Sequence, residues 1–174
     1  NQAVLATGIR DGHIRIWDTR LSSSNSRLNK EVMLIANTHS TSFSSSSVVS
    51  ALEFNQSNPS MIVSIGQPDY SVKIWDIRYQ AKRPKPVSSM QNPVEPGKRA
   101  RAFVDIAVHP FGDRIFALSS ANTGYSIVTA NMSVERVFRA PGLLTNSFYL
   151  RMTISKDGQW VICGSNNGST RLSR

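Results

Sequence analysis

The sequence predicts an all-β fold of repeated four-stranded units, a β-propeller, and three observations support this. Residues 71–78 (SVKIWDIR) are nearly repeated by residues 13–20 (HIRIWDTR), and in both segments apolar residues alternate with polar ones. This period of two is typical of a strand with one buried face. Ahead of each segment, another apolar stretch leads into a turn that carries an aspartate, Asp11 or Asp69. Both aspartates stand six residues before the tryptophan of their segment, so the two units share one spacing.

The order strand, Asp turn, strand and Trp-Asp is the signature of a WD40 blade. Because such a blade takes roughly 40–45 residues, the 174-residue chain is expected to hold about four blades. Closed rings usually contain more blades, here about seven. The chain, residues 1–174, is therefore interpreted as a single partial WD40 propeller domain. Further sequence or a partner chain is expected to cover the open edges.

Hydrophobic alternation also places the individual strands. The expected strands are residues 3–8, 13–18 and 31–37; 48–54, 61–66 and 71–78; 103–108, 114–120, 125–130 and 134–139; and 149–154 and 160–164, with the last blade ending at STRLSR. The third blade has SIVTAN where Trp-Asp would stand, so it is expected to rely on packing without a polar relay. The last blade also lacks the expected tryptophan.

A serine-rich insertion, residues 38–47, separates the first two blades. It is predicted to be a surface loop without a packing pattern. The insertion accounts for the spacing of 58 positions from Trp17 to Trp75, which exceeds one blade.

The net charge of +9 is concentrated in a second segment, residues 79–102, which is predicted to be a basic, proline-containing loop. Seven of the 20 basic residues lie between Arg78 and Arg101, against the single acid Glu95. A solvated loop is the favoured interpretation, because no aromatic residues are interleaved as a single-strand platform requires. The alternative is nucleic-acid contact. Its candidate residues are Lys82, Arg83, Lys85, Lys98, Arg99 and Arg101.

His39 stands where a WD40 blade commonly has a histidine before its next inner strand. The usual role of such a histidine is to bridge a turn aspartate, a strand serine or threonine, and a buried indole N–H that needs a partner. Asp11, His39 and Asp69 are therefore predicted to be structural residues of the blades.

No catalytic constellation is evident. The three histidines lack metal-ligand spacing, and the one cysteine, Cys163, forms neither an internal disulfide nor a Cys-rich zinc site. The glycines form no phosphate-binding loop. The chain is thus predicted to be non-catalytic, with no cofactor and no metal, and no membrane partner is expected. A single cysteine fits a reducing compartment.

Arg20 and Arg78 stand two positions past the aspartates of the Trp-Asp pairs, Asp18 and Asp76. Each arginine is expected just beyond the end of its strand, so that both project toward one rim of the ring. Two guanidinium groups on a shared face can form planar, multidentate hydrogen bonds with a partner. The alternative is that each arginine pairs with the aspartate of its own blade.

These paired Trp-Asp-x-Arg segments in adjacent blades resemble those of WD40 substrate receptors of the cullin-4 RING ubiquitin ligases. More narrowly, the runs VLATGIRDGHIRIWDTR, VSIGQPDYSVKIWDIR and NSFYLRMTISKDGQWVICGSNNG resemble the denticleless family. The resemblance implies docking onto the damaged-DNA-binding adaptor of the ligase. The residues that it assigns to docking are Trp17, Asp18, Arg20, Trp75, Asp76 and Arg78.

By this resemblance, the chain is expected to be a nuclear substrate-recognition subunit. It would bridge the adaptor to S-phase substrates on the DNA sliding clamp, which are then ubiquitylated and degraded. Two alternatives remain: a WD40 scaffold outside the ubiquitin system, in chromatin or RNA processing, and a nucleic-acid binder acting through the basic segment.

Overall fold

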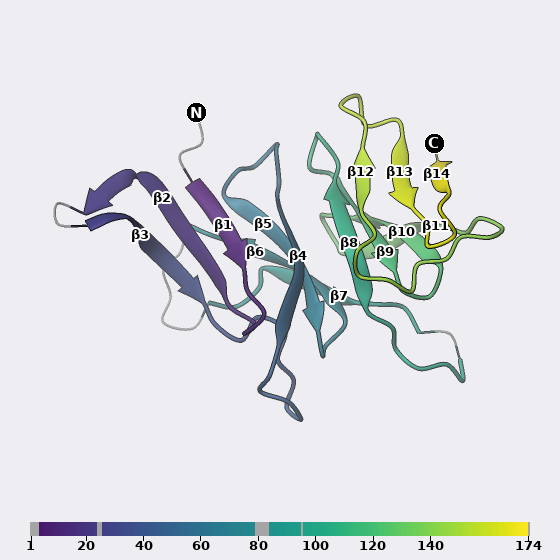
Figure 1. Cartoon of the computed structure of the whole chain (residues 1–174), viewed down its shortest axis with the longest axis horizontal. Coiled ribbons are helices and arrows are strands. Elements are labelled where there is room, and N and C mark those ends of the chain that lie inside the picture. The colour runs from purple at the N-terminus through teal and green to yellow at the C-terminus, as the bar shows by residue number, and fades with distance from the viewer. Residues whose placement is uncertain (1–3, 24–25, 79–83, 95, 174) are drawn as a thin grey trace.

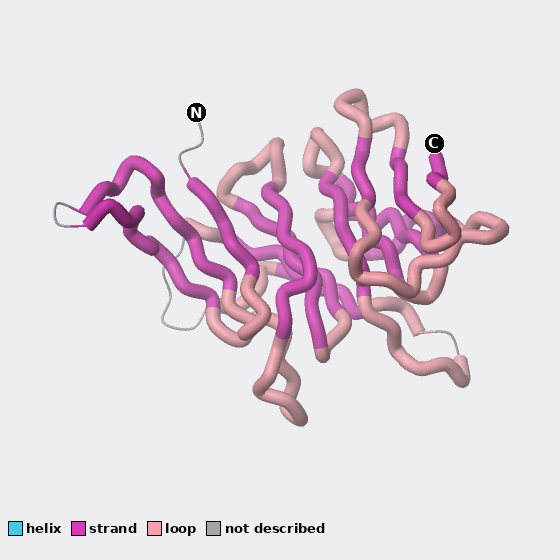
Figure 2. Tube along the Cα trace, in the orientation of Figure 1, coloured by secondary structure: helices cyan, strands magenta, loops and turns pink. Residues whose placement is uncertain are grey.

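The computed structural model describes residues 4–23, 26–78, 84–94 and 96–173. This part of the chain consists of strands, turns and irregular connections, without a helix (Figure 2). The strands are β1 (Val4–Gly8), β2 (Ile14–Ser23), β3 (Ser26–Ile35), β4 (Val48–Phe54), β5 (Met61–Gln67), β6 (Ser71–Asp76), β7 (Ser88–Gln91), β8 (Phe103–Val108), β9 (Arg114–Ser119), β10 (Thr123–Val128), β11 (Ser133–Phe138), β12 (Met152–Ile154), β13 (Val161–Gly164) and β14 (Thr170–Ser173).

The strands form four antiparallel sheets that follow one another along the chain, each a simple up-and-down meander. We number these blades one (β1-β2-β3), two (β4-β5-β6-β7), three (β8-β9-β10-β11) and four (β12-β13-β14). Figure 1 shows the four blades side by side in chain order, with β4, β8 and β12 toward the middle of the molecule. Strand β4 contacts β8, and β8 contacts β12, as the inner strands of neighbouring propeller blades do. The prediction of a partial WD40 β-propeller is confirmed.

Apolar residues at alternate strand positions form two cores between neighbouring blades. One core joins blades one and two, where Ile14 and Ile16 pack in one cluster with Ile62 and Trp75. The other joins blades two and three through Ile65 and Phe103, with ten further buried residues. Burial of each large apolar side chain contributes about 1.5–3 kcal/mol, so the interfaces between blades are the main source of stability.

Most of the strands lie where the alternation predicted them, but blade one differs. Strand β2 was expected to end at residue 18 and instead continues to Ser23, and it pairs with β3 from Ser26 onward. The register shifts between Asp18 and Ser22, and this bulge lets the two strands continue as a hairpin beyond the core. The wide spacing of the two tryptophans therefore comes from this long hairpin as well as from residues 38–47.

The serine-rich insertion is more ordered than the sequence indicated. Thr41 and Ser44 exchange two backbone hydrogen bonds and close a tight turn. Ser47 is buried, and Gly12 approaches it so closely that a Cβ atom there would overlap its side chain. The expectation that these residues have no packing pattern is wrong at Ser47, because this residue fills the contact between blades one and two.

The basic segment also contains an unexpected strand. Strand β7 lies within residues 79–102, which were predicted to be a loop throughout, and it pairs with β6 in a register that sets Val72 opposite Met90. The pairing satisfies the outer backbone groups of β6, which would otherwise be an unpaired edge. Residues 79–83, and with them Lys82 and Arg83, lie outside the described residues.

The antiparallel order gives the arc two faces. We call "relay face" the one formed by the connections at residues 36–47, 68–70, 92–102, 120–122 and 139–151, which runs along the lower edge of Figure 1. We call "arginine face" the opposite one, where β2 and β6 end and where the connections at residues 55–60 and 109–113 lie.

Candidate functional site

The arginine face carries two Asp-Arg pairs of the same geometry. Asp18 receives three hydrogen bonds from Arg20: from the backbone N–H at 2.9 Å, from Nε at 3.0 Å and from Nη2 at 2.8 Å. Asp76 receives the same set from Arg78, at 2.9, 3.0 and 2.6 Å. The two pairs occupy equivalent places, since Asp18 lies opposite Val4 and Asp76 opposite Met61, the first residues of β1 and β5. Both arginines therefore leave adjacent blades at the same face.

The arginines are exposed although they are paired. Arg20 keeps 70% of its side-chain surface in solvent and Arg78 keeps 58%, whereas their aspartates keep 13% and 7%. The pairing within each blade is the alternative that the sequence left open, and the structure contains it. The expected position of Arg20 is wrong, because this residue lies inside β2, at the bulge. The fork to the aspartate holds the guanidinium plane in a fixed orientation at the surface.

Both aspartates are strongly acidic. Hydrogen bonds from Arg20 lower the pKa of Asp18 from 3.8 to about 2, and hydrogen bonds from Arg78 likewise lower the pKa of Asp76. Each pair is consequently fully ionised at physiological pH. Exposed ion pairs of this kind contribute little to the free energy of unfolding, so neither pair is expected to stabilise the fold much.

A buried hydrogen-bond relay links the first two blades near the relay face. Trp75 Nε1 donates to Ser64 Oγ at 2.9 Å, and Ser64 Oγ lies 2.9 Å from His39 Nε2. His39 Nδ1 lies 2.9 Å from Asp69 Oδ1. Because the indole can only donate, the network assigns one direction: Ser64 donates to Nε2, and Nδ1–H donates to Asp69. This arrangement is the one that the sequence predicted for His39 and Asp69.

The relay fixes the protonation of its members. Burial lowers the pKa of His39, although Asp69 acts in the opposite direction. For Asp69, burial alone would raise the pKa, but hydrogen bonds from His39, Lys73 and Ser71 more than offset this, and the net direction is downward. The relay therefore contains a neutral imidazole and an ionised carboxylate, with Lys73 Nζ 2.5 Å from Asp69 Oδ2.

A glycine makes the close packing of this relay achievable. A Cβ atom on Gly66 would overlap both the ring of His39 and the carbonyl oxygen of Val48. The position therefore requires the residue without a side chain, since the backbone oxygen cannot move aside.

The other blades satisfy their polar groups differently. In blade one, Trp17 Nε1 donates to Thr7 Oγ1 at 3.1 Å, and Asp11 accepts from the backbone N–H of His13 at 3.0 Å, so Asp11 shapes the turn and no histidine relay reaches it within the described residues. In blade three, Thr145 Oγ1 donates to Ser119 O at 2.6 Å. This single contact is not a Trp-Asp relay, and the described residues of blade three contain none.

Two carboxylates on the inner strands escaped the sequence analysis. Glu53 on β4 accepts from the backbone N–H of Val108 on β8 at 2.9 Å, and Asp105 on β8 accepts from the N–H of Met152 on β12 at 2.8 Å. Each therefore connects one inner strand to the next. Burial raises the pKa of Glu53 from 4.5 to about 7 and also raises the pKa of Asp105. Nothing in their sequence spacing distinguishes them from surface acids.

The raised pKa of Glu53 predicts a pH-dependent effect of Glu53→Gln. Between pH 4.5 and about 7 the folded chain keeps a proton that the unfolded chain loses, so this group lowers the free energy of unfolding as pH rises. We expect Glu53→Gln to change stability little near pH 4.5 and to raise it by about 1–2 kcal/mol near pH 8, after allowance for solvent screening. Urea unfolding at both pH values measures this, and an equal effect at both would contradict it.

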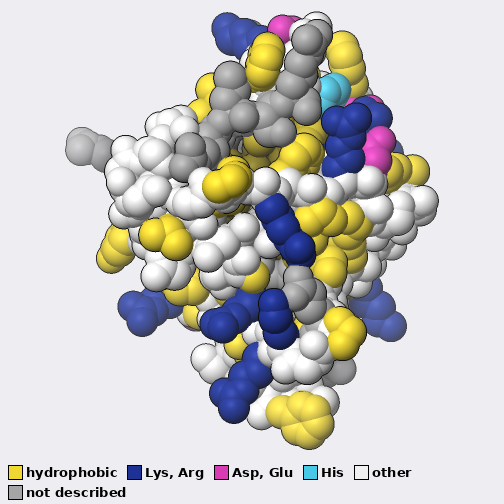
Figure 3. Space-filling view, turned by 90° about the vertical axis from the view of Figure 1, so that its right-hand side faces the viewer, with side chains coloured by type: hydrophobic (Ala, Val, Ile, Leu, Met, Phe, Trp, Pro, Cys, Tyr) yellow, Lys and Arg dark blue, Asp and Glu magenta, His cyan; other side chains and the backbone are white. Residues whose placement is uncertain are grey.

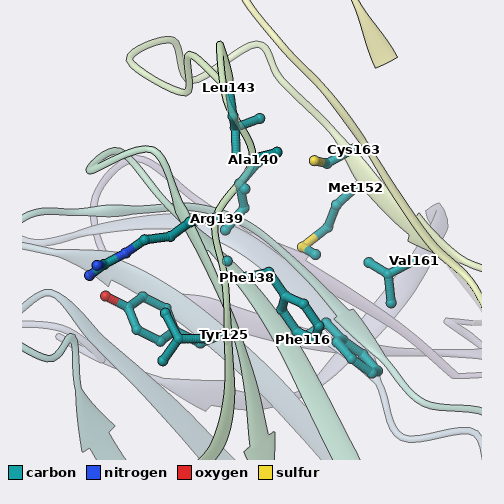
Figure 4. Close-up of a pocket in the computed structure, with 12 residues that line it drawn as sticks. Phe116, Tyr125, Phe138, Arg139, Ala140, Leu143, Met152, Val161 and Cys163 are labelled. Atoms are coloured by element: carbon teal, nitrogen blue, oxygen red, sulfur yellow. The ribbon is translucent and has the colours of Figure 1, made fainter. Parts of the chain in front are cut away.

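A cavity of about 290 Å³ lies between blades three and four. Figure 4 shows Phe116 and Phe138 from blade three facing Met152, Val161 and Cys163 from blade four, with the Tyr125 hydroxyl directed toward the end of Arg139. The described lining offers no carboxylate or histidine, hence no acid-base pair for catalysis. Its features are those of the packing between two blades.

The described part of the basic segment carries four exposed cations. Lys85, Lys98, Arg99 and Arg101 are all exposed, with Lys85 between β6 and β7 and the other three between β7 and β8. Figure 3 shows Lys and Arg side chains spread over this side of the molecule, while the acidic side chains that are visible lie in the upper half of the view.

The described residues contain neither a metal-binding cluster nor a membrane-spanning helix. Among the described residues, no three or more His, Cys, Asp or Glu side chains gather as a metal-binding group would. The same residues contain no helix of the length and hydropathy that a membrane span needs.

The four meander sheets, the Trp-Asp strands and the His39 relay define the class of protein as a WD40 β-propeller chain. No protein-family model matches the sequence. Curated relatives do: protein lethal(2)denticleless of Drosophila melanogaster is 29% identical over 186 residues, covering 95% of this chain and 24% of the relative. Denticleless protein homolog A of Xenopus laevis is 28% identical, covering 98% and 27%, and cell division cycle protein cdt2 of Schizosaccharomyces pombe is 30% identical, covering 89% and 32%.

These relatives confirm the assignment to the denticleless type that the motifs indicated. The chain spans only about a quarter to a third of the length of the relatives that it matches.

Proposed function

We propose that this chain is the propeller part of a substrate-recognition subunit of a cullin-4 RING ubiquitin ligase, and that it acts in the nucleus. The arginine face docks onto the damaged-DNA-binding adaptor, and the substrates are S-phase proteins held on the DNA sliding clamp. The denticleless-type relatives support the proposal. The subunit supplies no chemistry itself. It raises the effective concentration of substrate lysines near the conjugating enzyme.

The observation that carries the proposal is the paired geometry of Arg20 and Arg78. Two exposed guanidinium groups stand at equivalent places of adjacent blades, and each is held by a fork to a largely buried aspartate. Such preorganised donors lose little entropy when a partner's carboxylate or carbonyl oxygen binds. Arginine anchors of this kind are frequent at protein interfaces.

The test is the double variant Arg20→Ala with Arg78→Ala. We expect its affinity for the adaptor to fall at least about tenfold, while its thermal unfolding changes little because exposed pairs add little stability. Surface plasmon resonance with the purified adaptor measures the first and circular dichroism the second. Unchanged adaptor binding by the folded double variant would defeat the docking proposal.

Arg114 provides the matched control. It begins β9 at the arginine face, bonds Glu135 through Nε at 2.8 Å and contacts Asp113, yet it belongs to blade three, which has no Trp-Asp strand. Arg114→Ala should leave adaptor binding unchanged. An equal loss with this variant would show that any arginine of the face suffices. Adaptor binding also separates the proposal from a WD40 scaffold that works in chromatin or RNA processing.

A further inference from the structure

A groove of about 720 Å³ opens on the relay face, on the side away from the two Asp-Arg pairs. Three parts of the chain form it: residues 93–94 and 98–101 between β7 and β8, residues 120–123 at the start of β10, and residues 144 and 146 ahead of β12. The groove therefore spans blade three, with neighbours on both sides.

Hydrogen bonds hold these three parts of the chain together. Ser120 N donates to Ala102 O at 2.9 Å, and the buried Asn92 donates from Nδ2 to Arg101 O at 2.7 Å and to Ser119 Oγ at 2.9 Å. On the other side, Thr145 N donates to Asn122 Oδ1 at 2.8 Å. Asn92 and Thr145 are almost fully buried. Their hydrogen bonds therefore fix the loops that form the walls of the groove.

The two walls differ in character. One wall presents Lys98, Arg99 and Arg101. The opposite wall presents the amides of Asn122 and Asn146, whose Oδ1 atoms accept from Thr145 and from Asn166 and whose NH₂ groups can donate. Two exposed apolar side chains, Val94 and Leu144, also line the groove. The described lining contains no carboxylate.

We propose that this groove binds an extended, acidic segment of a partner protein. The cationic wall attracts carboxylates, and the amides can donate hydrogen bonds to peptide carbonyl groups. Val94 and Leu144 can pack against the aliphatic parts of the bound chain. The inference deepens the proposed function by naming the substrate class that the relay face recognises. It also places the substrate on the face opposite the adaptor, so that one subunit holds both at once.

A nucleic acid fits the same groove less well. A single strand needs exposed aromatic rings on which bases stack, and the only aromatic side chain in the described lining, Tyr125, is 7% exposed. The cations also stand along one wall, whereas a duplex requires a broad basic surface.

The experiment measures fluorescence anisotropy with the whole protein. The probe is a labelled peptide of about 15 residues that alternates Asp and Glu with Gly and Ser, and its partner probe has Asn and Gln in their place. We expect the acidic probe to bind and the amide probe not to bind. The triple variant Lys98→Ala, Arg99→Ala, Arg101→Ala should weaken binding at least about tenfold, as the loss of three ion pairs in a partly enclosed groove implies.

The matched control removes three exposed cations elsewhere, with the variants R10A, R136A and K156A. This control should bind the acidic probe as the wild type does. Equal binding of both probes, or equal losses in both triple variants, would overturn the proposal. So would a DNA oligonucleotide that binds more tightly than the peptide and loses affinity only in the groove variant, because the groove would then be a phosphate site.

The result is separable from the docking proposal. The Arg20 and Arg78 double variant should keep its peptide affinity, and the groove variant should keep its adaptor affinity. If the Arg20 and Arg78 variant keeps its adaptor affinity, the docking proposal has failed; if the groove variant keeps its peptide affinity, the groove proposal has failed.

Discussion

Replacement of His39 by alanine is expected to lower the free energy of unfolding by about 3–5 kcal/mol. The imidazole is fully buried and links Asp69 to Ser64, which in turn accepts from Trp75. Its removal leaves a cavity and deprives both Ser64 and the buried carboxylate of a partner. Asp69 keeps Ser71 and Lys73, so the loss should not extend to complete unfolding. Urea denaturation at about pH 7.5 measures it.

His13→Ala is the control for this variant. His13 is partly exposed and bonds only to its neighbour Asp11 in the described structure, with its ring nitrogen 3.0 Å from the backbone oxygen. We expect this change to cost less than about 1 kcal/mol. A loss of the same size in both variants would contradict a relay role for His39.

The relay also has a pH signature. Because the folded pKa of His39 lies below its usual 6.5, the unfolded chain takes up a proton first as pH falls, so the stability that His39 contributes should begin to decline below about pH 6.5, opposite in sign to the effect of Glu53 over the same range. Asp69, whose pKa is also lowered, adds a further decline as pH falls below about 3.8. His39→Ala should remove the upper part of this decline. A decline between pH 6.5 and 5 that persists unchanged would place its origin in other groups.

The sequence predicted the relay for a physical reason. A buried indole needs an acceptor, and the fixed spacing from Asp69 to Trp75 identifies the strand pair that must supply it. The strands of blades two and three were predicted well, because β4 and β8 are short, largely apolar runs. Strand β7 was missed because its sequence, SSMQ, has no apolar alternation, and its extended conformation comes from pairing with the edge of β6.

Contacts between blades could not be predicted from the sequence either. Glu53 and Val108 are 55 positions apart in the chain, and only the arrangement of the inner strands brings them together. The groove on the relay face has the same origin, since its cations were visible as a basic segment while its amide wall comes from blades three and four. For Arg20 and Arg78, the motif indicated the possible pairing with the aspartates, but it did not show that β2 continues past Asp18 and includes Arg20.

Phe103→Ala should have an effect of similar size on the contact between blades two and three. Phe103 is 1% exposed and shares a core with Ile65 and Val72 of blade two. Its ring meets Tyr125 edge to face, with centroids 6.2 Å apart. Truncation of a buried phenylalanine costs about 3–5 kcal/mol, through lost transfer energy and the cavity that remains.

Phe111 gives the contrast, because it is 73% exposed at the turn between β8 and β9, and Phe111→Ala should change stability by less than about 1 kcal/mol. Phe103 and His39 lie in different interfaces, on either side of blade two, so their losses should add if blades unfold together. If the Phe103 variant is as stable as the Phe111 variant, the Phe103 ring does not contribute to the stability of the interface between blades two and three. Blades two and three are also joined by hydrogen bonds, from Val108 N–H to Glu53 and from Asn92 to Ser119, but Phe103 is the largest fully buried side chain in their apolar packing, so we expect its loss to weaken this contact most.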